Sequence, residues 1–303
     1  MAGEDSVKTY TTPVAFRSAL ESRLRKGTSG AGFQRRRQIF VFGRFLARLI
    51  AQFGDNIIVK GGLALELRLE RARTTRDIDL AVFGKIDELL ERLQAAGQLD
   101  LHDFMSFEVA TDGDIDGDGV IYGGHHFKVH GKLGGQTYLH FPIDVMFGGV
   151  MLGEASPIQF RDDLSFMGIA PPTVKLLPVQ THIAEKLHAY TIPRPTTNFR
   201  VRDLPDLALL ATLVDGPSLL VIKEALALTF KARGTHSVPS AFPSPPASWE
   251  REYAALAEEN DLPWRSLGEA YAAAKRFIEP VLTETTDASW NPTAWQWDAK
   301  REK

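Results

Sequence analysis

The first half of the chain alternates between two hydrophobic periods. Residues 34–53 carry apolar side chains near helical spacing, whereas residues 76–82 alternate polar and apolar side chains as a strand does. Residues 56–59 are apolar enough for a short buried strand, which ends at Lys60-Gly61-Gly62. The same patterns predict helices at residues 13–26, 63–69 and 85–96, and strands at residues 104–110, 120–130 and 138–147.

The second half of the chain has a different texture. Residues 237–246 are rich in proline and serine and predict a loop. Helical patterns cover residues 180–190, 204–214, 219–230, 249–259 and 267–281. We therefore predict an α+β protein in which a mixed sheet flanked by helices is followed by a mainly α-helical domain. The expected limits are 1–33 for a basic helical arm, 34–160 for the α/β domain and 161–303 for the helical domain.

Composition places the 303-residue chain among ordinary globular proteins. Hydrophobic residues make up 44% and charged residues 24%, and there is no cysteine. A disulfide framework, a cysteine-ligated metal and a thiol nucleophile are thus excluded. The N-terminus is polar and acidic, and the most apolar stretch, residues 39–53, is interrupted by Arg44 and Arg48. We expect a cytoplasmic protein with no membrane partner.

Charge is unevenly distributed, although the net charge is only −3. Between residues 17 and 48 a single acid, Glu21, accompanies nine basic residues: Arg17, Arg23, Arg25, Lys26, Arg35, Arg36, Arg37, Arg44 and Arg48. Such a cluster on helices can follow a phosphate backbone. It is also what a solvated helix face looks like. A role in binding a polyanion therefore depends on chemistry elsewhere in the chain.

That chemistry is suggested by Asp77-Ile78-Asp79, where Asp77 follows Gly62 by fifteen residues. On a strand the two aspartates project to the same side, roughly 7 Å apart. Paired carboxylates suit a hard cation such as Mg²⁺, which keeps room for substrate phosphates. Gly61-Gly62 lets backbone N–H groups approach a phosphate where the next helix begins.

A third acid, Asp144, lies in an otherwise apolar strand, residues 142–147. A carboxylate in a buried strand requires a partner or a metal. If the two strands are neighbours, Asp77, Asp79 and Asp144 can hold two metal ions for an in-line phosphoryl displacement. Asp-x-Asp alone is common by chance, in which case Arg76 pairs with a nearby carboxylate. Adjacent His125 and His126 face opposite sides of a strand and make a poor zinc pair.

The order of these motifs resembles the AbiEii/AbiGii nucleotidyltransferase family. Its members are toxins of AbiE-type toxin–antitoxin systems, include the mycobacterial MenT enzymes, and belong to the DNA polymerase β-like nucleotidyltransferase superfamily. The segments that carry the resemblance are 60–65, 73–80, 122–124, 134–135, 143–145, 185–189 and 202–207. The resemblance implies a polymerase β-like nucleotidyltransferase domain over the α/β region.

The resemblance also implies roles for individual residues. Asp77, Asp79 and Asp144 correspond to the metal ligands. Lys60, Gly61, Gly62, Arg76 and Lys186 correspond to the nucleotide site, although a glycine stands at 62 where the superfamily usually has serine. Asp77, Asp79, Lys186, Asp203 and Asp206 correspond to the catalytic set. Alternatively, Asp203 is a helix N-cap, and Glu185 and His188 are ordinary surface residues.

The implied activity is transfer of NMP from an NTP, with Mg²⁺ or Mn²⁺ as cofactor, to the 3′ end of tRNA. This modification would block translation, and a cognate AbiEi-like antitoxin would be the genetic partner. Arg35, Arg36 and Arg37 then become candidates for RNA binding. Two alternatives stay open: transfer to a hydroxyl of a protein or small molecule, and a non-catalytic nucleotide- or RNA-binding module.

Overall fold

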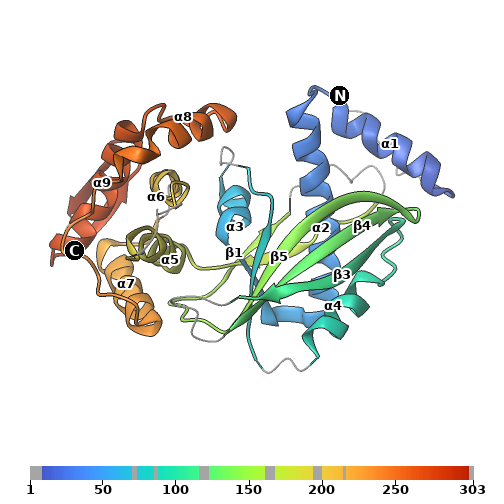
Figure 1. The fold of residues 1–303 in the computed structure, drawn as a ribbon, viewed down its shortest axis with the longest axis horizontal. Helices are drawn as coiled ribbons and strands as arrows, with labels where there is room; N and C mark the ends of the chain where they lie inside the picture. The colour runs from blue at the N-terminus through green and yellow to red at the C-terminus, as the bar shows by residue number, and fades with distance from the viewer. Residues whose placement is uncertain are drawn as a thin grey trace.

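The computed structural model describes residues 9–69, 74–84, 88–115, 123–160, 168–193, 200–213 and 216–299. A sheet with its helices forms one side of the molecule and a helical part forms the other (Figure 1). The first part contains α1 (Pro13–Arg25), α2 (Ala31–Phe53), the short helix Gly54–Asn56, β1 (Ile57–Lys60), α3 (Gly61–Arg68), β2 (Ile78–Val82), α4 (Leu89–Gly97), β3 (Met105–Asp114), β4 (Gly124–Leu133), β5 (Gln136–Phe147), β6 (Ser156–Gln159) and β7 (Thr173–Leu176). The second part contains α5 (Val179–Thr191), α6 (Asp203–Leu210), α7 (Leu219–Arg233), the short helix Ala247–Trp249, α8 (Glu250–Glu259), α9 (Leu267–Thr283), β8 (Ala288–Asn291) and β9 (Gln296–Ala299).

The long helix α2 is the centre of the first hydrophobic core. Phe42 and Phe45 pack against the sheet with ring centroids 4.9 Å and 5.5 Å from Phe141. Two arginines of α2, Arg44 and Arg48, are also buried, and both bind the carboxylate of Asp103 at 2.7 Å. The basic side chains of this helix therefore serve packing as well as surface charge, because buried charges must be paired.

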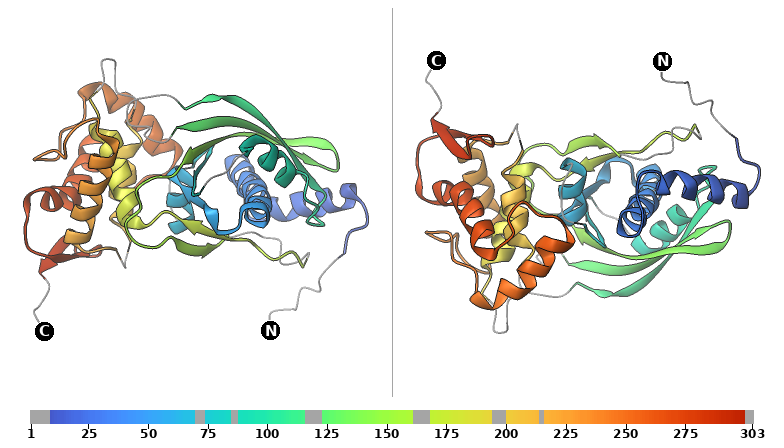
Figure 2. Two further views of the ribbon diagram at one scale, coloured as in Figure 1. Left: turned by 90° about the horizontal axis from the view of Figure 1, so that it is seen from below. Right: turned by 90° about the horizontal axis from the view of Figure 1, so that it is seen from above.

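Strands β1 to β7 form one mixed sheet in the order β3-β4-β5-β2-β1-β7-β6. The pairs β2–β5 and β1–β7 are parallel, and the other neighbours are antiparallel. The sheet bends around α2, so that β3–β5 and β6–β7 lie on opposite sides of this helix in both views of Figure 2. One consequence is that β1, β2 and β5, which carry Lys60, Asp79 and Asp144, are adjacent in the middle of the sheet.

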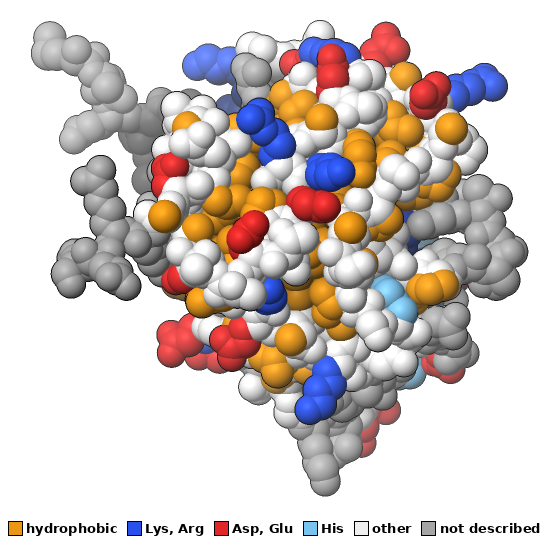
Figure 3. All heavy atoms as spheres, turned by 90° about the vertical axis from the view of Figure 1, so that its left-hand side faces the viewer, with side chains coloured by type: hydrophobic (Ala, Val, Ile, Leu, Met, Phe, Trp, Pro, Cys, Tyr) orange, Lys and Arg blue, Asp and Glu red, His pale blue; other side chains and the backbone are white. Residues whose placement is uncertain are grey.

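The C-terminal part has a second hydrophobic core, to which α3 contributes Leu65. Its terminal hairpin is fixed to the helices by tryptophans: Trp290 donates to the carbonyl of Ala211 at 2.6 Å and Trp297 to that of Phe277 at 2.9 Å. The outer face of this part mixes acidic and basic side chains among apolar ones (Figure 3). Among the helices in the described ranges, none has both the length and the apolar character to cross a membrane.

The predicted fold class is confirmed: a mixed sheet flanked by helices precedes a helical region. The proline-rich segment 237–246 contains no helix or strand, as expected. Strands β6 to β9 were missed, because four residues are too few for an alternating pattern to stand out and, unlike β1, none of them is a continuous apolar run. Parts of three predicted elements, namely 85–87, 120–122 and residue 214, lie outside the described residues, as do Arg73 and Tyr122 of the motifs. The domain limits stay a prediction.

Candidate active site

A row of polar residues crosses four adjacent strands. Asp79 on β2 is the register partner of both Asp144 on β5 and Lys60 on β1. The row continues on β4, where His126 is the partner of Asp144. Register partners project to the same side of a sheet, so these four side chains share one face. The fold thus brings Asp79 and Asp144 side by side.

Gly61, which follows β1, is packed directly against this row. A Cβ at position 61 would overlap Oδ2 of Asp79, and the φ angle of Gly61 is +59°. Only glycine meets both conditions without strain. Gly61 and Gly62 also open helix α3, whose first backbone N–H groups have no partner within the helix. The sequence motif therefore places a helix start beside a carboxylate.

Asp79 lies in an unfavourable environment for a negative charge. Burial and the neighbouring Asp77 raise the pKa of Asp79 to about 7, with a further contribution from Asp144. Lys60 and Lys186 oppose this rise through their positive charges. Carboxylates that repel one another in this way are stabilised when a cation joins them.

The other two acids each have a protein partner. The hydroxyl of Thr75 donates to Oδ1 of Asp77, and Nδ1 of His126 lies 2.6 Å from Oδ1 of Asp144. In the described part of the chain, no group of three or more His, Asp or Glu side chains is arranged to hold a metal ion. The acids are therefore neighbours that a bound cation would have to draw together. In the sequence, His126 was considered only as a zinc ligand. Its neighbour Phe127 is apolar and points into the core, so His126 points to the opposite face, which is the face of Asp144.

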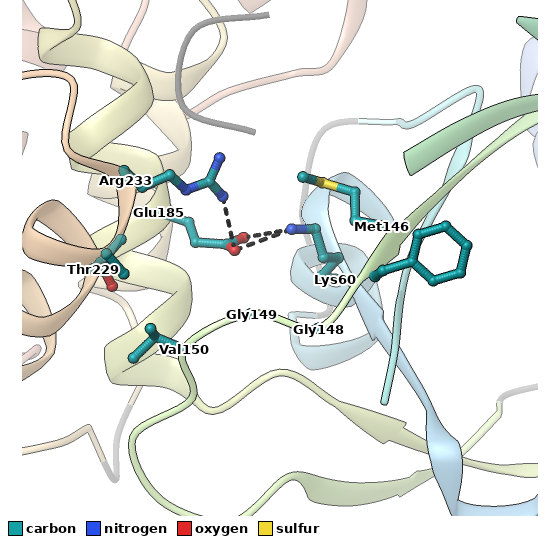
Figure 4. Close-up of a pocket in the computed structure, with 10 residues that line it drawn as sticks. Lys60, Met146, Gly148, Gly149, Val150, Glu185, Thr229 and Arg233 are labelled. Carbon is teal, nitrogen blue, oxygen red and sulfur yellow. Dashed lines mark hydrogen bonds and ion pairs between the residues drawn. The ribbon is translucent and has the colours of Figure 1, made fainter. Parts of the chain in front are cut away.

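Lys60 links the sheet to the helical part of the molecule. Its ammonium lies 3.0 Å from Oε1 of Glu185 on α5, and Arg233 on α7 reaches the same oxygen at 3.3 Å (Figure 4). Burial alone would raise the pKa of Glu185, but Lys60 and Arg233 lower it to about 2. The interpretation of Glu185 as an ordinary surface residue was wrong, because its partners come from distant segments. His188, assigned likewise, is also buried.

A small pocket lies beside this ion-pair bridge. Lys60, Glu185 and Arg233 line it together with Met146 and the backbone of Gly148 and its neighbour, at the end of β5 (Figure 4). The pocket therefore joins the polar row of the sheet to the helical part. Its walls offer both cations and apolar surface.

Lys186 is held by both acids of the motif on α6. Its ammonium lies 2.8 Å from Oδ1 of Asp203 and 2.8 Å from Oδ2 of Asp206, and all three side chains are largely buried. The predicted catalytic residues of the helical part are thus brought together. The alternative N-cap role of Asp203 is wrong: Arg202 occupies the cap position, and the helix has no side-chain cap.

The predicted arginines have diverse surroundings. Arg76 is 78% exposed and pairs with Glu259 at 3.5 Å. Arg35 donates to Glu66 at 2.6 Å and to the carbonyl of Thr75 at 2.8 Å, so it supports the loop before β2.

Arg37 donates to the carbonyl of Tyr138 and stacks over its ring. Arg36 is exposed, and its guanidinium donates to the carbonyl of Lys26 at 2.8 Å.

Comparison with known proteins decides the family. The sequence pattern described as "Nucleotidyl transferase AbiEii toxin, Type IV TA system" matches residues 44–303. The chain belongs to the AbiEii family. This AbiEii protein is accordingly a nucleotidyltransferase and a toxin of a type IV toxin–antitoxin system, with an NTP as substrate and an antitoxin as partner. Nucleotidyltransferases of this kind generally use a divalent metal ion.

A solved structure shows the same fold. MenT4, a nucleotidyltransferase toxin from Mycobacterium tuberculosis, superposes with a TM-score of 0.53 and 19% sequence identity, covering 91% of this chain and 92% of that one. JHP933 from Helicobacter pylori gives a TM-score of 0.47 and 16% identity over 82% of this chain and 93% of that one. A comparison with curated protein sequences found no match.

Proposed function

We propose that this AbiEii enzyme transfers a nucleoside monophosphate from an NTP to the 3′ end of a tRNA, with Mg²⁺ or Mn²⁺ held by Asp77, Asp79 and Asp144. The observation that carries the proposal is the register of the sheet. It places Asp79 between Asp144 and Lys60, with Gly61 against its carboxylate. The carboxylate of Asp79, the ammonium of Lys60 and the first turn of α3 are thus neighbours. A triphosphate needs such a site, because its negative charges bind metal ions, ammonium groups and helix N-termini.

The donor set fits a hard divalent cation. The raised pKa of Asp79 reflects its burial and the charges of Asp77 and Asp144, which a divalent ion would neutralise. Only oxygen donors are needed for Mg²⁺ or Mn²⁺, and carboxylates provide them. An ion held by Asp77, Asp79 and Asp144 would supply positive charge to the phosphoryl group during transfer.

Two lysines are available for the triphosphate. Lys60 and Lys186 both lower the pKa of Asp79, so both positive charges act at this point. Each is held by carboxylates: Lys60 by Glu185, and Lys186 by Asp203 and Asp206. We assign the β- and γ-phosphates to these ammonium groups and to the N–H groups at Gly61 and Gly62. Arg76, whose exposed ion pair is weak, is the third candidate contact.

The reaction is an in-line displacement at the α-phosphate. The 3′-hydroxyl oxygen of the acceptor forms the new P–O bond, the bond from the α-phosphorus to the bridging oxygen breaks, and pyrophosphate leaves with that electron pair. The hydroxyl proton passes to water. The choice of tRNA rests on the resemblance to MenT toxins. Of the arginines assigned to RNA binding, Arg36 is exposed, whereas Arg35 and Arg37 are half-buried.

Sequencing of RNA 3′ ends after brief expression in bacteria tests this function. We expect tRNAs with extra 3′ nucleotides when the wild type is expressed, and none when Asp79→Ala is expressed at the same level. Growth inhibition should disappear with the extensions. Undiminished toxicity of Asp79→Ala would show that catalysis is not its cause, and unchanged tRNA ends in poisoned cells would point to another acceptor.

A further inference from the structure

Nitrogen-bearing side chains run along β4, away from the acids. Burial alternates along this strand: Phe127, Val129 and Leu133 are buried in the core. The residues between them turn to the opposite face, which is the face of the polar row. They are His126, Lys128, His130 and Lys132, and we call them the β4 track. Successive members are about 7 Å apart, since a strand rises about 3.4 Å per residue.

The track begins at the proposed catalytic centre. His126 is the register partner of Asp144 and is hydrogen-bonded to it, so the first member of the track touches an acid of the active site. His130 pairs with His140 of β5, and their rings are edge to face with centroids 4.5 Å apart. The sheet therefore offers cations, the half-buried ring of His130 and the exposed ring of His140 on one surface that starts at the acids.

The two lysines of the track have exchangeable partners. Lys128 lies 2.5 Å from Oδ1 of Asp112, and Lys132 pairs with Glu108; both acids belong to the neighbouring strand β3. The Lys128 side chain is 60% exposed and that of Asp112 40%. Exposed ion pairs of this kind contribute little to stability and are easily screened. A phosphate arriving at the surface can replace the carboxylate without unfolding the strand.

By contrast, several basic residues near the N-terminus have other duties. Arg44 and Arg48 are buried around Asp103, and Arg35 and Arg37 support the loop before β2 and the ring of Tyr138. A polyanion would have to break these contacts to reach their guanidinium groups. At the β4 track the contacts to be broken are ion pairs that reach solvent, since the Lys128 side chain is 60% exposed and the Glu108 partner of half-buried Lys132 is 58% exposed.

We propose that the β4 track binds the single-stranded 3′ end of the RNA acceptor and guides it to the acids. This inference rests on the proposed function and specifies the surface that the acceptor uses. Lys128 and Lys132 bind backbone phosphates, which displace Asp112 and Glu108 from them. The rings of His130 and His140 stack on bases, a sequence-tolerant mode of binding single strands. The terminal hydroxyl then lies at the His126 end, next to Asp144.

Two matched double variants test the surface by opposite changes of charge. Lys128→Gln with Lys132→Gln removes two cations, and Asp112→Asn with Glu108→Gln removes their two competing anions. Binding of deacylated tRNA to the full chain is measured by fluorescence anisotropy between 50 and 200 mM KCl, without NTP. Lys275→Gln is the control, because Lys275 is exposed on α9, at the other end of the molecule (Figure 1).

We expect the lysine variant to bind tRNA about tenfold more weakly at 50 mM KCl. Its plot of log affinity against log salt should be shallower by about 1.4, since each single-strand phosphate contact contributes about 0.7. The acid variant should bind more tightly than the wild type, and Lys275→Gln should match the wild type. A merely structural role of these ion pairs would weaken binding in both double variants or in neither.

Wild-type affinity of the lysine variant, or weaker binding by the acid variant, would overturn the inference. The inference would also be overturned if the wild type did not bind tRNA and instead bound the antitoxin through the β4 track. The binding assay contains no NTP, so its outcome is independent of the transferase assay. Loss of binding by the lysine variant without any nucleotide transfer by the wild type would contradict the proposed function alone.

Discussion

The backbone of Gly61 touches the carboxylate of Asp79 so closely that a Cβ at position 61 would overlap Oδ2. The same residue has a φ angle of +59°, which residues other than glycine rarely adopt. One position is therefore restricted twice, once by the backbone and once by an acid of the site. The two restrictions can be separated, because the chain holds a second glycine with the same φ angle in open space, Gly54.

Gly61→Ala should be more harmful than Gly54→Ala. At Gly54 only the positive-φ backbone, with ψ at −135°, is strained, which costs about 1–3 kcal/mol in the free energy of unfolding. At Gly61 the new methyl group must also displace Asp79, which should cost at least about 1 kcal/mol more. Nucleotide transfer should fall at least about tenfold for Gly61→Ala and stay near the wild-type rate for Gly54→Ala. Urea unfolding and a transfer assay measure both; equal behaviour of the two variants would contradict this packing.

Glu185→Gln should weaken the connection between the sheet and the helical part. It leaves the ammonium of Lys60 and the guanidinium of Arg233 without their shared carboxylate, which should cost about 1–3 kcal/mol. Glu21→Gln is the matched control, because its ion pairs with Arg17 and Arg25 lie on one helix surface and should be worth less than about 1 kcal/mol. Chemical unfolding of both variants gives the comparison. An equal loss of unfolding free energy in the two variants would mean that the Glu185 ion pairs stabilise the protein no more than exposed ones do.

Acidification should destabilise the protein partly through His182. Burial, with Lys186 and Arg68 nearby, lowers the pKa of His182 to about 3, whereas an unfolded histidine titrates near 6.5. Between these values the unfolded chain binds a proton that the folded chain does not. The stabilisation is thus complete above pH 6.5 and is lost as the pH falls toward 3, by up to about 1.4 kcal/mol per pH unit.

His182→Gln should make this pH dependence less steep. The free energy of unfolding is compared at pH 7.5 and pH 4.5 for the wild type, His182→Gln and the control His102→Asn. The side chain of His102 is 90% exposed, so the control should follow the wild type. A wild-type slope in His182→Gln would show that other groups account for the acid sensitivity.

Lys186→Met should abolish transfer and also destabilise the fold. It leaves the carboxylates of Asp203 and Asp206 without the ammonium between them, at a cost of about 3 kcal/mol. Adding Asp206→Asn to Lys186→Met removes one of the two charges and should restore part of the lost stability. It should not restore transfer, because the ammonium assigned to the triphosphate is still missing. Recovery of transfer in the double variant would reduce Lys186 to a purely structural role.

The sequence was most informative where the evidence was local or carried by motifs. The Asp77-x-Asp79 spacing, the glycine pair and the lone acid Asp144 were singled out as one candidate site. Asp79 and Asp144 do lie on adjacent strands, whereas Asp77 precedes β2, which begins at Ile78. The fold places Asp79 and Asp144 in register, so the condition that their strands are neighbours is met. The long helices were also predictable, since their apolar faces repeat over many residues.

Contacts between distant segments could not be predicted in the same way. Glu185 was taken for a surface residue because nothing in its own helix shows that Lys60 and Arg233 converge on it. Arg44 and Arg48 were counted as surface charge, although Asp103 neutralises both in the core. Local periodicity gives the face of an element but not the side chains that the tertiary structure brings to that face.

The central claim, that Asp79 and its neighbours catalyse nucleotide transfer to tRNA, is tested most directly with purified protein. The wild type and Asp79→Asn are incubated with deacylated tRNA, Mg²⁺ and each α-labelled NTP in turn, after circular dichroism has shown that both are folded. Asp79→Asn keeps the shape of the side chain and removes its charge. We expect the wild type to label the 3′ end of tRNA and Asp79→Asn to be at least about a hundredfold slower. Equal labelling by both proteins, or label that appears on no RNA, would contradict the account.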